Sequence, residues 1–267
     1  MSIKLGIVGG GVMGEALLSR LIKTQIYQPA EIIVSDPQPQ RRDFLHQNYR
    51  VQVTADNPDI AAATEVWLLA VKPQVFAPVA KELARMSLKE AVIISILAGV
   101  NLSKLTEVFP GRAVIRAMPN TPATVGAAMS AIAPNHKVTT QQLDLAKRIF
   151  QSVGAVLEVD DRYMDAVTGL SGSGPAFVAL MLEALTDGGV AAGLSRSVAQ
   201  QLALQTILGT AQLLKESNLH PAQLKDQVTS PGGTTIAGVL ELERSGFRAA
   251  LINAVLAAKE RSIQLGQ

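Results

Sequence analysis

The chain has no cysteine among its 267 residues and only three histidines. The absence of cysteine excludes disulfide bonds, thiolate nucleophiles and zinc sites with sulfur ligands. His46, His136 and His220 all lie outside the glycine-rich motifs described below. We therefore expect no bound metal, and we expect a reaction at those motifs to proceed without a histidine base.

Long apolar runs and an excess of one charge are also missing. Lysine and arginine (24) nearly balance aspartate and glutamate (22), and the scattered charges leave no electrostatic footprint for nucleic acid or an anionic membrane. The apolar run at residues 176–182 is far shorter than the about 20 residues that span a bilayer. A strand pattern begins directly after Met1 and leaves no room for a signal peptide. We expect a cytoplasmic protein whose partners are neither nucleic acid nor membrane.

The first part of the chain alternates short apolar runs with helical patterns. The runs are rich in valine and isoleucine and nearly continuous in hydrophobicity, as in strands covered on both faces. Such alternation predicts a parallel sheet built from right-handed crossover units. The expected strands are residues 3–8, 32–35, 66–71, 91–97, 113–118 and 156–159. The expected helices between them are residues 14–24, 40–48, 75–85, 102–108 and 140–151.

After about residue 162 the strand pattern ends and only helical patterns follow. We expect two domains, residues 1–162 and residues 163–267, and no linker rich in proline, serine or glycine separates them. A helix is therefore expected to join them. The second domain is apolar and all-helical, and a second copy of the chain would cover its surplus apolar surface. This pattern favours a homodimer.

A glycine motif follows the first expected strand. The strand runs into Gly9-x-Gly11-x-x-Gly14, and a helical pattern comes next. The first glycine permits a tight turn, the second lets the backbone approach a pyrophosphate, and the third lets helix and strand pack closely. The pyrophosphate would lie on free N–H groups at the positive end of the helix dipole. Asp36 ends the second expected strand about twenty residues further on, which is the context of a dinucleotide site. The fold class is therefore α/β, with an N-terminal Rossmann domain that binds a dinucleotide.

The identity of the dinucleotide stays open on these residues. Asp36 favours NAD, because an acid at the end of the second strand binds the ribose hydroxyls. Ser35 could donate a hydrogen bond to a 2′-phosphate, and Arg41 and Arg42 lie about a turn away. A solvated first turn of a helix explains the two arginines at least as well.

Two polar residues further along are candidates for the same site. Lys72 opens an expected helix, where a cation is electrostatically unfavourable, and this placement suggests that it serves an anion or the nicotinamide side of the cofactor. An exposed lysine without a role is the alternative. Asn57 could reach the adenosine half, and a role as helix N-cap explains it equally well.

Two clusters of small residues in the second domain, residues 170–176 and 230–235, are not demanded by core packing. The second cluster leads into a helix, where backbone N–H groups and hydroxyls would bind a carboxylate. A tight interhelical turn with Thr235 as an ordinary cap is the alternative. Neither cluster holds a strong acid or base, which an enzyme that oxidises an alcohol needs. A protonated imine accepts hydride directly, so the clusters favour imine reduction.

Five motifs carry a resemblance to a known family. They are residues 71–74, 116–122, 170–176, 220–226 and 230–236. In this order, and across nearly the whole chain, they closely resemble the pyrroline-5-carboxylate reductase family. The resemblance implies hydride transfer from NAD(P)H to the C=N bond of 1-pyrroline-5-carboxylate, which gives L-proline in the last step of proline biosynthesis. It also implies an all-α C-terminal dimerisation domain, a homodimer that assembles into a larger ring such as a decamer, and NADPH as cofactor with NADH as the alternative.

The resemblance also assigns residues to the site. The Thr235 hydroxyl would bond the ring nitrogen as the catalytic group. Some relatives carry a glutamate just before the His-Pro pair, where this chain has Asn218 and Leu219, so no acidic residue is assigned there. The residues expected to hold the substrate carboxylate are Ser230, Gly232, Gly233, Thr234 and Thr235. The residues expected to bind the dinucleotide are Gly9, Gly10, Gly11, Val12, Met13, Gly14, Ser35, Asp36, Asn57, Ala70, Val71, Lys72, Pro73, Ile96, Leu97 and Ala98.

Three alternatives share parts of these patterns. A β-hydroxyacid dehydrogenase has the same two-domain plan but is expected to carry a lysine and an asparagine one turn apart on the first long helix, and residues 165–177 contain neither. A reductase of another cyclic imine would differ only in the ring size that its pocket accepts. A non-catalytic NAD(P)H sensor would have no need of the carboxylate-binding run at residues 230–235.

Overall fold

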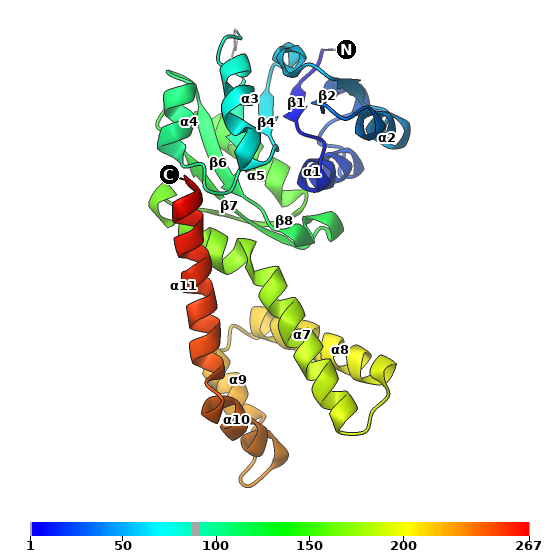
Figure 1. Ribbon diagram of the computed structural model, residues 1–267, viewed down its shortest axis with the longest axis vertical. Coiled ribbons are helices and arrows are strands. Elements are labelled where there is room, and N and C mark those ends of the chain that lie inside the picture. Colours follow the sequence, from blue (N-terminus) through cyan, green and yellow to red (C-terminus); the bar gives the residue numbers. More distant parts are fainter. Residues whose placement is uncertain (1, 87–90, 267) are drawn as a thin grey trace. The chain divides into compact units, whose positions relative to one another are not determined.

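The computed structural model describes residues 2–86 and 91–266, which divide into two compact units (Figure 1). The first unit comprises Met1–Ser173 and Ala257–Gln267, and the second comprises Gly174–Leu256. The chain returns to the first unit within its last helix, α11 (Phe247–Gly266), which therefore belongs to both units. The domain boundary at residue 162 stays a prediction.

An eight-stranded sheet forms the centre of the first unit. Its strands are β1 (Leu5–Val8), β2 (Ile32–Ser35), β3 (Gln52–Thr54), β4 (Val66–Leu69), β5 (Val92–Ser95), β6 (Val114–Met118), β7 (Ala128–Pro134) and β8 (Gly154–Glu158). Their order across the sheet is β3-β2-β1-β4-β5-β6-β7-β8, and every neighbouring pair is parallel except β6 with β7. The first six strands have the order of a doubly wound dinucleotide-binding fold. The carboxyl ends of β1, β2, β4 and β5 therefore meet at one edge of the sheet.

Helices cover both faces of this sheet (Figure 1). β1, β2, β4 and β5 are buried at every residue, which explains their continuous apolar sequences. One apolar layer includes side chains of α1 (Val12–Lys23), α2 (Pro39–Tyr49) and α5 (Thr140–Gln151). The layer on the other face includes side chains of α3 (Phe76–Leu83) and α4 (Leu102–Val108). The short helices of this unit are η1 (Pro29–Glu31), η2 (Asn57–Ala62), η3 (Pro73–Val75), η4 (Thr121–Val125), η5 (Asp161–Tyr163), α6 (Met164–Val167) and the π-helix η6 (Thr168–Gly172).

The predicted parallel sheet has one antiparallel pair, β6 with β7, and the strands β3 and β7 were not predicted. β7 reads Ala-Met-Ser-Ala-Ile-Ala-Pro, with small side chains in place of the valines and isoleucines that mark the other strands, and β3 has only three residues. β7 runs antiparallel to β6, with Arg116 opposite Ala133. The chain passes from β6 to β7 through η4 alone, which is too short for the crossover that a parallel pair needs.

The second unit is helical and has no strand among its described residues, as expected. It contains α7 (Gly174–Ala191), α8 (Arg196–Ser217), α9 (Pro221–Gln227), α10 (Thr234–Arg244) and the beginning of α11. α7 and α8 pack closely at Gly189, where a Cβ would lie only 2.9 Å from the Cβ of Ala199. Across the part of the chain that the structure describes, no helix is long and apolar enough to cross a membrane.

Candidate active site

The glycine motif forms the turn between β1 and α1, and its three glycines have different surroundings. Gly9 has a φ of +99°, and a Cβ there would lie 2.7 Å from the carbonyl oxygen of Ala70. A Cβ on Gly14 would lie 2.2 Å from the carbonyl oxygen of Gly9. A Cβ on Gly11 would meet no heavy atom within 4 Å. The first and last glycines are therefore required by packing within the turn, whereas Gly11 faces open space.

The N-terminus of α1 has no side-chain cap. Gly11 is its N-cap residue and offers no side chain to the N–H groups of the first turn. These N–H groups and the positive end of the helix dipole face the open space beside Gly11, which suits an anion. The turn therefore fits the pyrophosphate of a dinucleotide. Val12 and Met13 follow at the start of the helix, and the Val12 side chain is exposed.

The structure brings most of the predicted dinucleotide residues to one edge of the sheet. Ser35 is the last residue of β2, and Asp36 follows it. The loop after β4 contains Ala70, Val71, Lys72 and Pro73, and the loop after β5 contains Ile96, Leu97 and Ala98. β2 and β4 are the parallel neighbours of β1, and β5 is the parallel neighbour of β4, so the carboxyl ends of these strands lie on the same edge of the sheet as the glycine turn. The backbone N–H of Gly9 donates to the carbonyl oxygen of Ser35 (2.8 Å). Asn57 begins η2, shortly after β3, which is separated from β1 by β2.

Asp36 is buried and binds the backbone on both sides. Its Oδ2 accepts a hydrogen bond from the N–H of Gly10 (3.0 Å), and its Oδ1 accepts one from the N–H of Gln38 (2.9 Å). Both carboxylate oxygens are thus used to join the glycine turn to the loop after β2. In the structure Asp36 is a brace for the glycine turn, and its expected role as a ribose ligand stays a prediction.

Arg41 and Arg42 are held beside this brace. Arg41 forms an ion pair with Glu15, donates to the carbonyl oxygen of Gly10, and lies with its guanidinium 4.9 Å from the centre of the Phe44 ring. Arg42 donates from Nη1 to the carbonyl oxygens of Asp36 (2.8 Å) and of the following proline (3.0 Å). Neither side chain belongs to a freely solvated helical turn.

Glu15 connects α1 to α2 through Arg41 and Tyr49. The Tyr49 hydroxyl donates to Oε1 of Glu15 (2.7 Å), and Arg41 binds Oε2. Burial acts to raise the pKa of Glu15, but the hydrogen bonds from Arg41 and Tyr49 outweigh it and hold that pKa below its ordinary value. Burial and the bond to Glu15 raise the pKa of Tyr49 to about 12. The carboxylate is therefore the charged centre of this cluster.

The side chains of Ser35 and Asn57 bind each other instead of facing solvent. Ser35 is fully buried, and its hydroxyl donates to Oδ1 of Asn57 (2.9 Å). The amide of Asn57 donates in turn to Oε2 of Glu82 (2.8 Å). Asn57 is the first residue of η2 and not its cap, which is Asp56. Lys72 is exposed, and within the described residues its ammonium forms no ion pair.

The second unit contributes a separate glycine-rich turn before α10. Gly232 has a φ of +66°, and Gly233 is the N-cap residue of the helix, with no side-chain cap. A Cβ on Gly233 would lie 2.3 Å from the Oγ of Ser230. Thr234 and Thr235 are the first two residues of α10, so Thr235 is not the cap. The N–H groups of the first turn are free of side-chain caps, as a carboxylate-binding turn requires.

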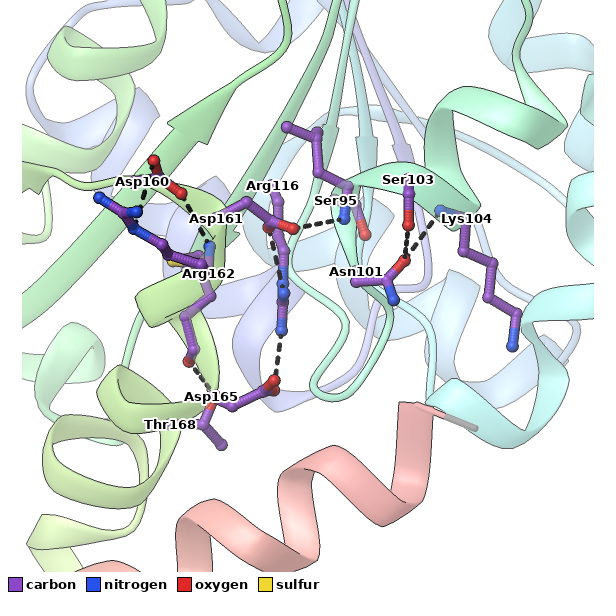
Figure 2. Close-up of polar contacts among 12 residues, drawn as sticks. Ser95, Asn101, Ser103, Lys104, Arg116, Asp160, Asp161, Arg162, Asp165 and Thr168 are labelled. Carbon is purple, nitrogen blue, oxygen red and sulfur yellow. Dashed lines mark hydrogen bonds and ion pairs between the residues drawn. The ribbon is translucent and has the colours of Figure 1, made fainter.

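Sequence patterns missed a buried ion-pair network near the carboxyl end of β6 (Figure 2). Arg116 binds Asp161 and Asp165 there. The available signal was an arginine inside an otherwise apolar strand, because a buried guanidinium requires partners of opposite charge. Among the described residues, no cluster of three or more histidine, aspartate or glutamate side chains is arranged to hold a metal ion.

Comparison with known proteins decides the family. A family model described as pyrroline-5-carboxylate reductase dimerisation matches residues 161–265, and one described as NADP oxidoreductase, coenzyme F420-dependent, matches residues 4–99. A pyrroline-5-carboxylate reductase of Synechocystis is 61% identical over 267 residues, which are the whole of both chains. The chain belongs to the pyrroline-5-carboxylate reductase family.

Solved structures of this family share the fold along the full chain. The pyrroline carboxylate reductase of Plasmodium falciparum with NADP bound has a TM-score of 0.90 and 34% identity, and the match covers 99% of this chain and 98% of that one. The pyrroline-5-carboxylate reductase of Coxiella burnetii has a TM-score of 0.91 and 33% identity, with both chains covered completely. The predicted family and fold class, a Rossmann domain followed by an all-α dimerisation domain, are confirmed. The roles of the individual site residues stay predictions.

Proposed function

We propose that this chain reduces 1-pyrroline-5-carboxylate to L-proline with NAD(P)H. The observation that carries the proposal is the 61% identity to a pyrroline-5-carboxylate reductase over the whole of both chains. The bound dinucleotide would supply a hydride to the imine carbon and be oxidised to NAD(P)+, while the π electrons of the protonated C=N bond would pass to nitrogen. No side chain has to remove a proton from carbon or oxygen, in agreement with the lack of an acid or base in the two small-residue clusters.

The glycine turn and the adjacent strand ends are proposed to hold the dinucleotide. The open space beside Gly11 and the uncapped N-terminus of α1 would receive the pyrophosphate. The loops after β4 and β5 would receive the nicotinamide half, because they continue along the same edge of the sheet. Lys72 is free of ion pairs among the described residues and would serve an anionic or amide group of the cofactor.

NADPH is proposed as the preferred reductant. The acid that would repel a 2′-phosphate, Asp36, has both oxygens on backbone N–H groups. Arg42, which forms no ion pair among the described residues, adds a positive charge beside the same loop, whereas the charge of Arg41 is paired with Glu15. These contacts partly offset the Asp36 charge and support NADPH.

The turn before α10 is proposed to hold the substrate. The N–H groups of the first helical turn, together with the Ser230 and Thr234 hydroxyls, would bind the carboxylate. The Thr235 hydroxyl would bond the ring nitrogen and orient the C=N bond toward the hydride. Thr235 would thereby act as the catalytic residue, by placement and not by proton transfer.

A homodimer is proposed as the working unit, with a decamer as the larger assembly. The dimerisation model matches the helical part of the chain, and many large apolar side chains on α7, α8 and α10 are exposed. Exposed apolar faces of this extent mark association surfaces. Light scattering on the purified protein would distinguish a dimer from a ring of five dimers.

The deciding experiment measures the loss of ultraviolet absorbance of NADPH, and separately of NADH, with racemic 1-pyrroline-5-carboxylate. Rapid substrate-dependent oxidation with L-proline as product is the expected result, and NADPH should be the faster cofactor. No oxidation of either cofactor by protein that still binds both would contradict the proposed reaction. Turnover of only a six-membered cyclic imine would favour the alternative reductase.

A further inference from the structure

The loop between β5 and α4 is packed from behind by the end of the chain. Gly99 in this loop has a φ of +76°, and a Cβ there would lie 3.0 Å from the Cβ of Leu265. A Cβ on Gly266 would lie 2.3 Å from the carbonyl oxygen of Gly99. The last turn of α11 therefore touches the backbone of this loop with no space for a methyl group between them.

This loop is the one proposed above to face the nicotinamide. Ile96, Leu97 and Ala98 immediately precede Gly99. The N–H of Leu97 donates to the Oγ of Ser95 (3.4 Å), and that of Ile96 donates to the carbonyl oxygen of β4 residue Leu69 (3.0 Å). The loop is thus bound to the sheet at its start. Its middle is held by Leu265 and Gly266, which pack against Gly99.

The far end of the loop is anchored by a buried ion pair. The N–H of Leu102, the first residue of α4, donates to Oδ2 of Asp161 (3.2 Å). Oδ1 of Asp161 accepts from Nη1 of Arg116 (3.1 Å), whose side chain is only 3% exposed. Arg116 thereby holds the carboxylate that fixes the start of α4.

The same guanidinium also holds the last turn of α11. Nη2 of Arg116 binds Oδ1 of Asp165 (3.3 Å), and that oxygen accepts a hydrogen bond from the hydroxyl of Ser262 (2.7 Å). Ser262 is itself only 3% exposed and lies one turn before Leu265. Figure 2 shows Arg116 between Asp161 and Asp165. One buried charge therefore links both the start of α4 and the end of α11.

We propose that the last turn of α11, residues 262–266, is a positioning element for the nicotinamide loop. Arg116, Asp165 and Ser262 hold this turn, and the turn holds Gly99 and the three residues before it. Close-packed interiors transmit small displacements, and a shift of about 1 Å between reacting groups can cost up to about 100-fold in rate. This inference rests on the proposed function, since it assigns the loop to the nicotinamide side of the cofactor.

A purely structural role predicts a different outcome. If the turn only stabilised the first unit, its loss would lower the melting temperature. It would then have the same effect on binding of the nicotinamide half of the cofactor as on binding of the other half. As a positioning element, it acts on the nicotinamide half alone. Binding of 2′-phospho-ADP-ribose, which lacks nicotinamide, would then be unaffected.

The test uses two variants of the full chain. One ends at residue 264 and loses the contact with Gly99, and the other is Ser262→Ala, with Ser262→Thr as the conservative rescue. We expect kcat with NADPH to fall about 10-fold in the shortened chain and about 3-fold in Ser262→Ala. Affinity for 2′-phospho-ADP-ribose, measured by calorimetry, should change by less than about 2-fold. Hydrogen exchange at amides 96–101 should become faster in both variants and return toward wild type in Ser262→Thr.

Arg261→Ala is the matched control, because Arg261 is exposed on the same turn and binds only Gln264 among the described residues. Unchanged kcat and unchanged exchange at amides 96–101 in both variants would overturn the proposal. Equal weakening of NADPH and 2′-phospho-ADP-ribose would overturn it as well. If the wild-type chain fails to reduce the imine, the proposed function fails, and the exchange and calorimetry data still decide the role of the turn.

Discussion

Asp36 occupies the position of a ribose-binding acid, but its carboxylate binds backbone N–H groups of this chain. Its position after β2 is typical of an acid that binds ribose hydroxyls. In the structure its oxygens bind the N–H groups of Gly10 and Gln38. Sequence spacing could predict that Asp36 lies beside the glycine turn, but not which way its carboxylate faces. That direction depends on which buried N–H groups are left without partners, and these are set by the tertiary fold.

The brace role predicts the effect of Asp36→Asn. Asparagine keeps one acceptor oxygen, so one backbone N–H loses its bond, at a cost of roughly 1–3 kcal/mol. The affinities for NADPH and NADH should then fall by similar factors, because the glycine turn serves both cofactors. Fluorescence titration of each cofactor measures this. Asp43→Asn, at an exposed position on α2, is the control. A selective loss of NADH affinity would show that Asp36 binds the ribose after all.

Gly11 and Gly14 of the first turn should respond differently to substitution. Gly14→Ala places a methyl group against the carbonyl oxygen of Gly9, where the distance would be 2.2 Å, so the variant should lose stability by a few kcal/mol, on the order of overpacked cores. Gly11→Val meets only open space and should keep its melting temperature, yet it blocks the space for a pyrophosphate and should abolish cofactor binding. Thermal unfolding and a cofactor titration of both variants provide the check. Normal binding by Gly11→Val would refute the placement of the pyrophosphate.

Thr235 is expected to affect turnover and not cofactor binding. Loss of a hydrogen bond that orients the C=N bond is worth about 1–3 kcal/mol, so Thr235→Ala should lower kcat by roughly 10- to 100-fold. Thr235→Ser keeps the hydroxyl and should retain most of the rate. Steady-state kinetics, together with NADPH affinity, separate the two effects. An unchanged rate in Thr235→Ala would remove its assigned role.

At the level of elements, apolar periodicity located the main helices and strands but not their ends. Residues such as Val71, Ile96 and Leu97 continue the apolar runs of β4 and β5, so the expected strands were too long. They lie in loops at the sheet edge that we assign to the cofactor. Leu97 is buried in the core, and Val71 and Ile96 pack partly against it, so the apolar pattern continues past the ends of the strands and periodicity does not mark where each strand stops. The sequence therefore located the strands but not the residues at which they end and the loops begin.

The contact between α1 and α2 gives a prediction for pH dependence. Because the folded-state pKa of Glu15 is lowered, its bonds to Arg41 and Tyr49 stabilise the fold above its unfolded pKa of about 4.3, and this contribution is lost as the pH falls through the folded-state value. Glu15→Gln should therefore lower the free energy of unfolding at neutral pH, by on the order of 1 kcal/mol for a partly exposed pair. The difference from wild type should shrink below about pH 4.

Urea unfolding at neutral and acidic pH measures this difference directly. Glu107→Gln is the matched control, since Glu107 is exposed on α4 and forms no ion pair within the described ranges. A Glu15→Gln difference that stays constant with pH would mean that the carboxylate charge contributes nothing to the link between α1 and α2.

At the scale of the whole molecule, the sequence distinguished a first part with alternating strands and helices from a second, all-helical part. It could not show which distant segments contact each other. The hydrogen bond from Ser262 to Asp165 joins residues 97 positions apart. Neither residue stands in a motif, and each is explained only once Arg116 is known to be buried. Local patterns identify elements, whereas such a network results from packing between them.

The exposed apolar surface of the second unit leads to a prediction about assembly. Leu204 and Leu208 lie one turn apart on α8 and are 52% and 57% exposed, so they form part of one apolar stripe. Charges introduced into the buried centre of an interface remove apolar contact and leave unpaired charge there. Leu204→Glu combined with Leu208→Glu should therefore convert the dimer into a folded monomer. Light scattering gives the mass, and circular dichroism verifies that the helices remain.

The same double variant also tests whether the dimer is needed for catalysis. If the partner's helical domain completes the active site, the monomer should bind NADPH normally and lose imine reduction. Thr206→Glu, on the opposite side of α8, adds a charge without altering the stripe and should stay dimeric and active. Full activity in a proven monomer would show that catalysis does not need the dimer.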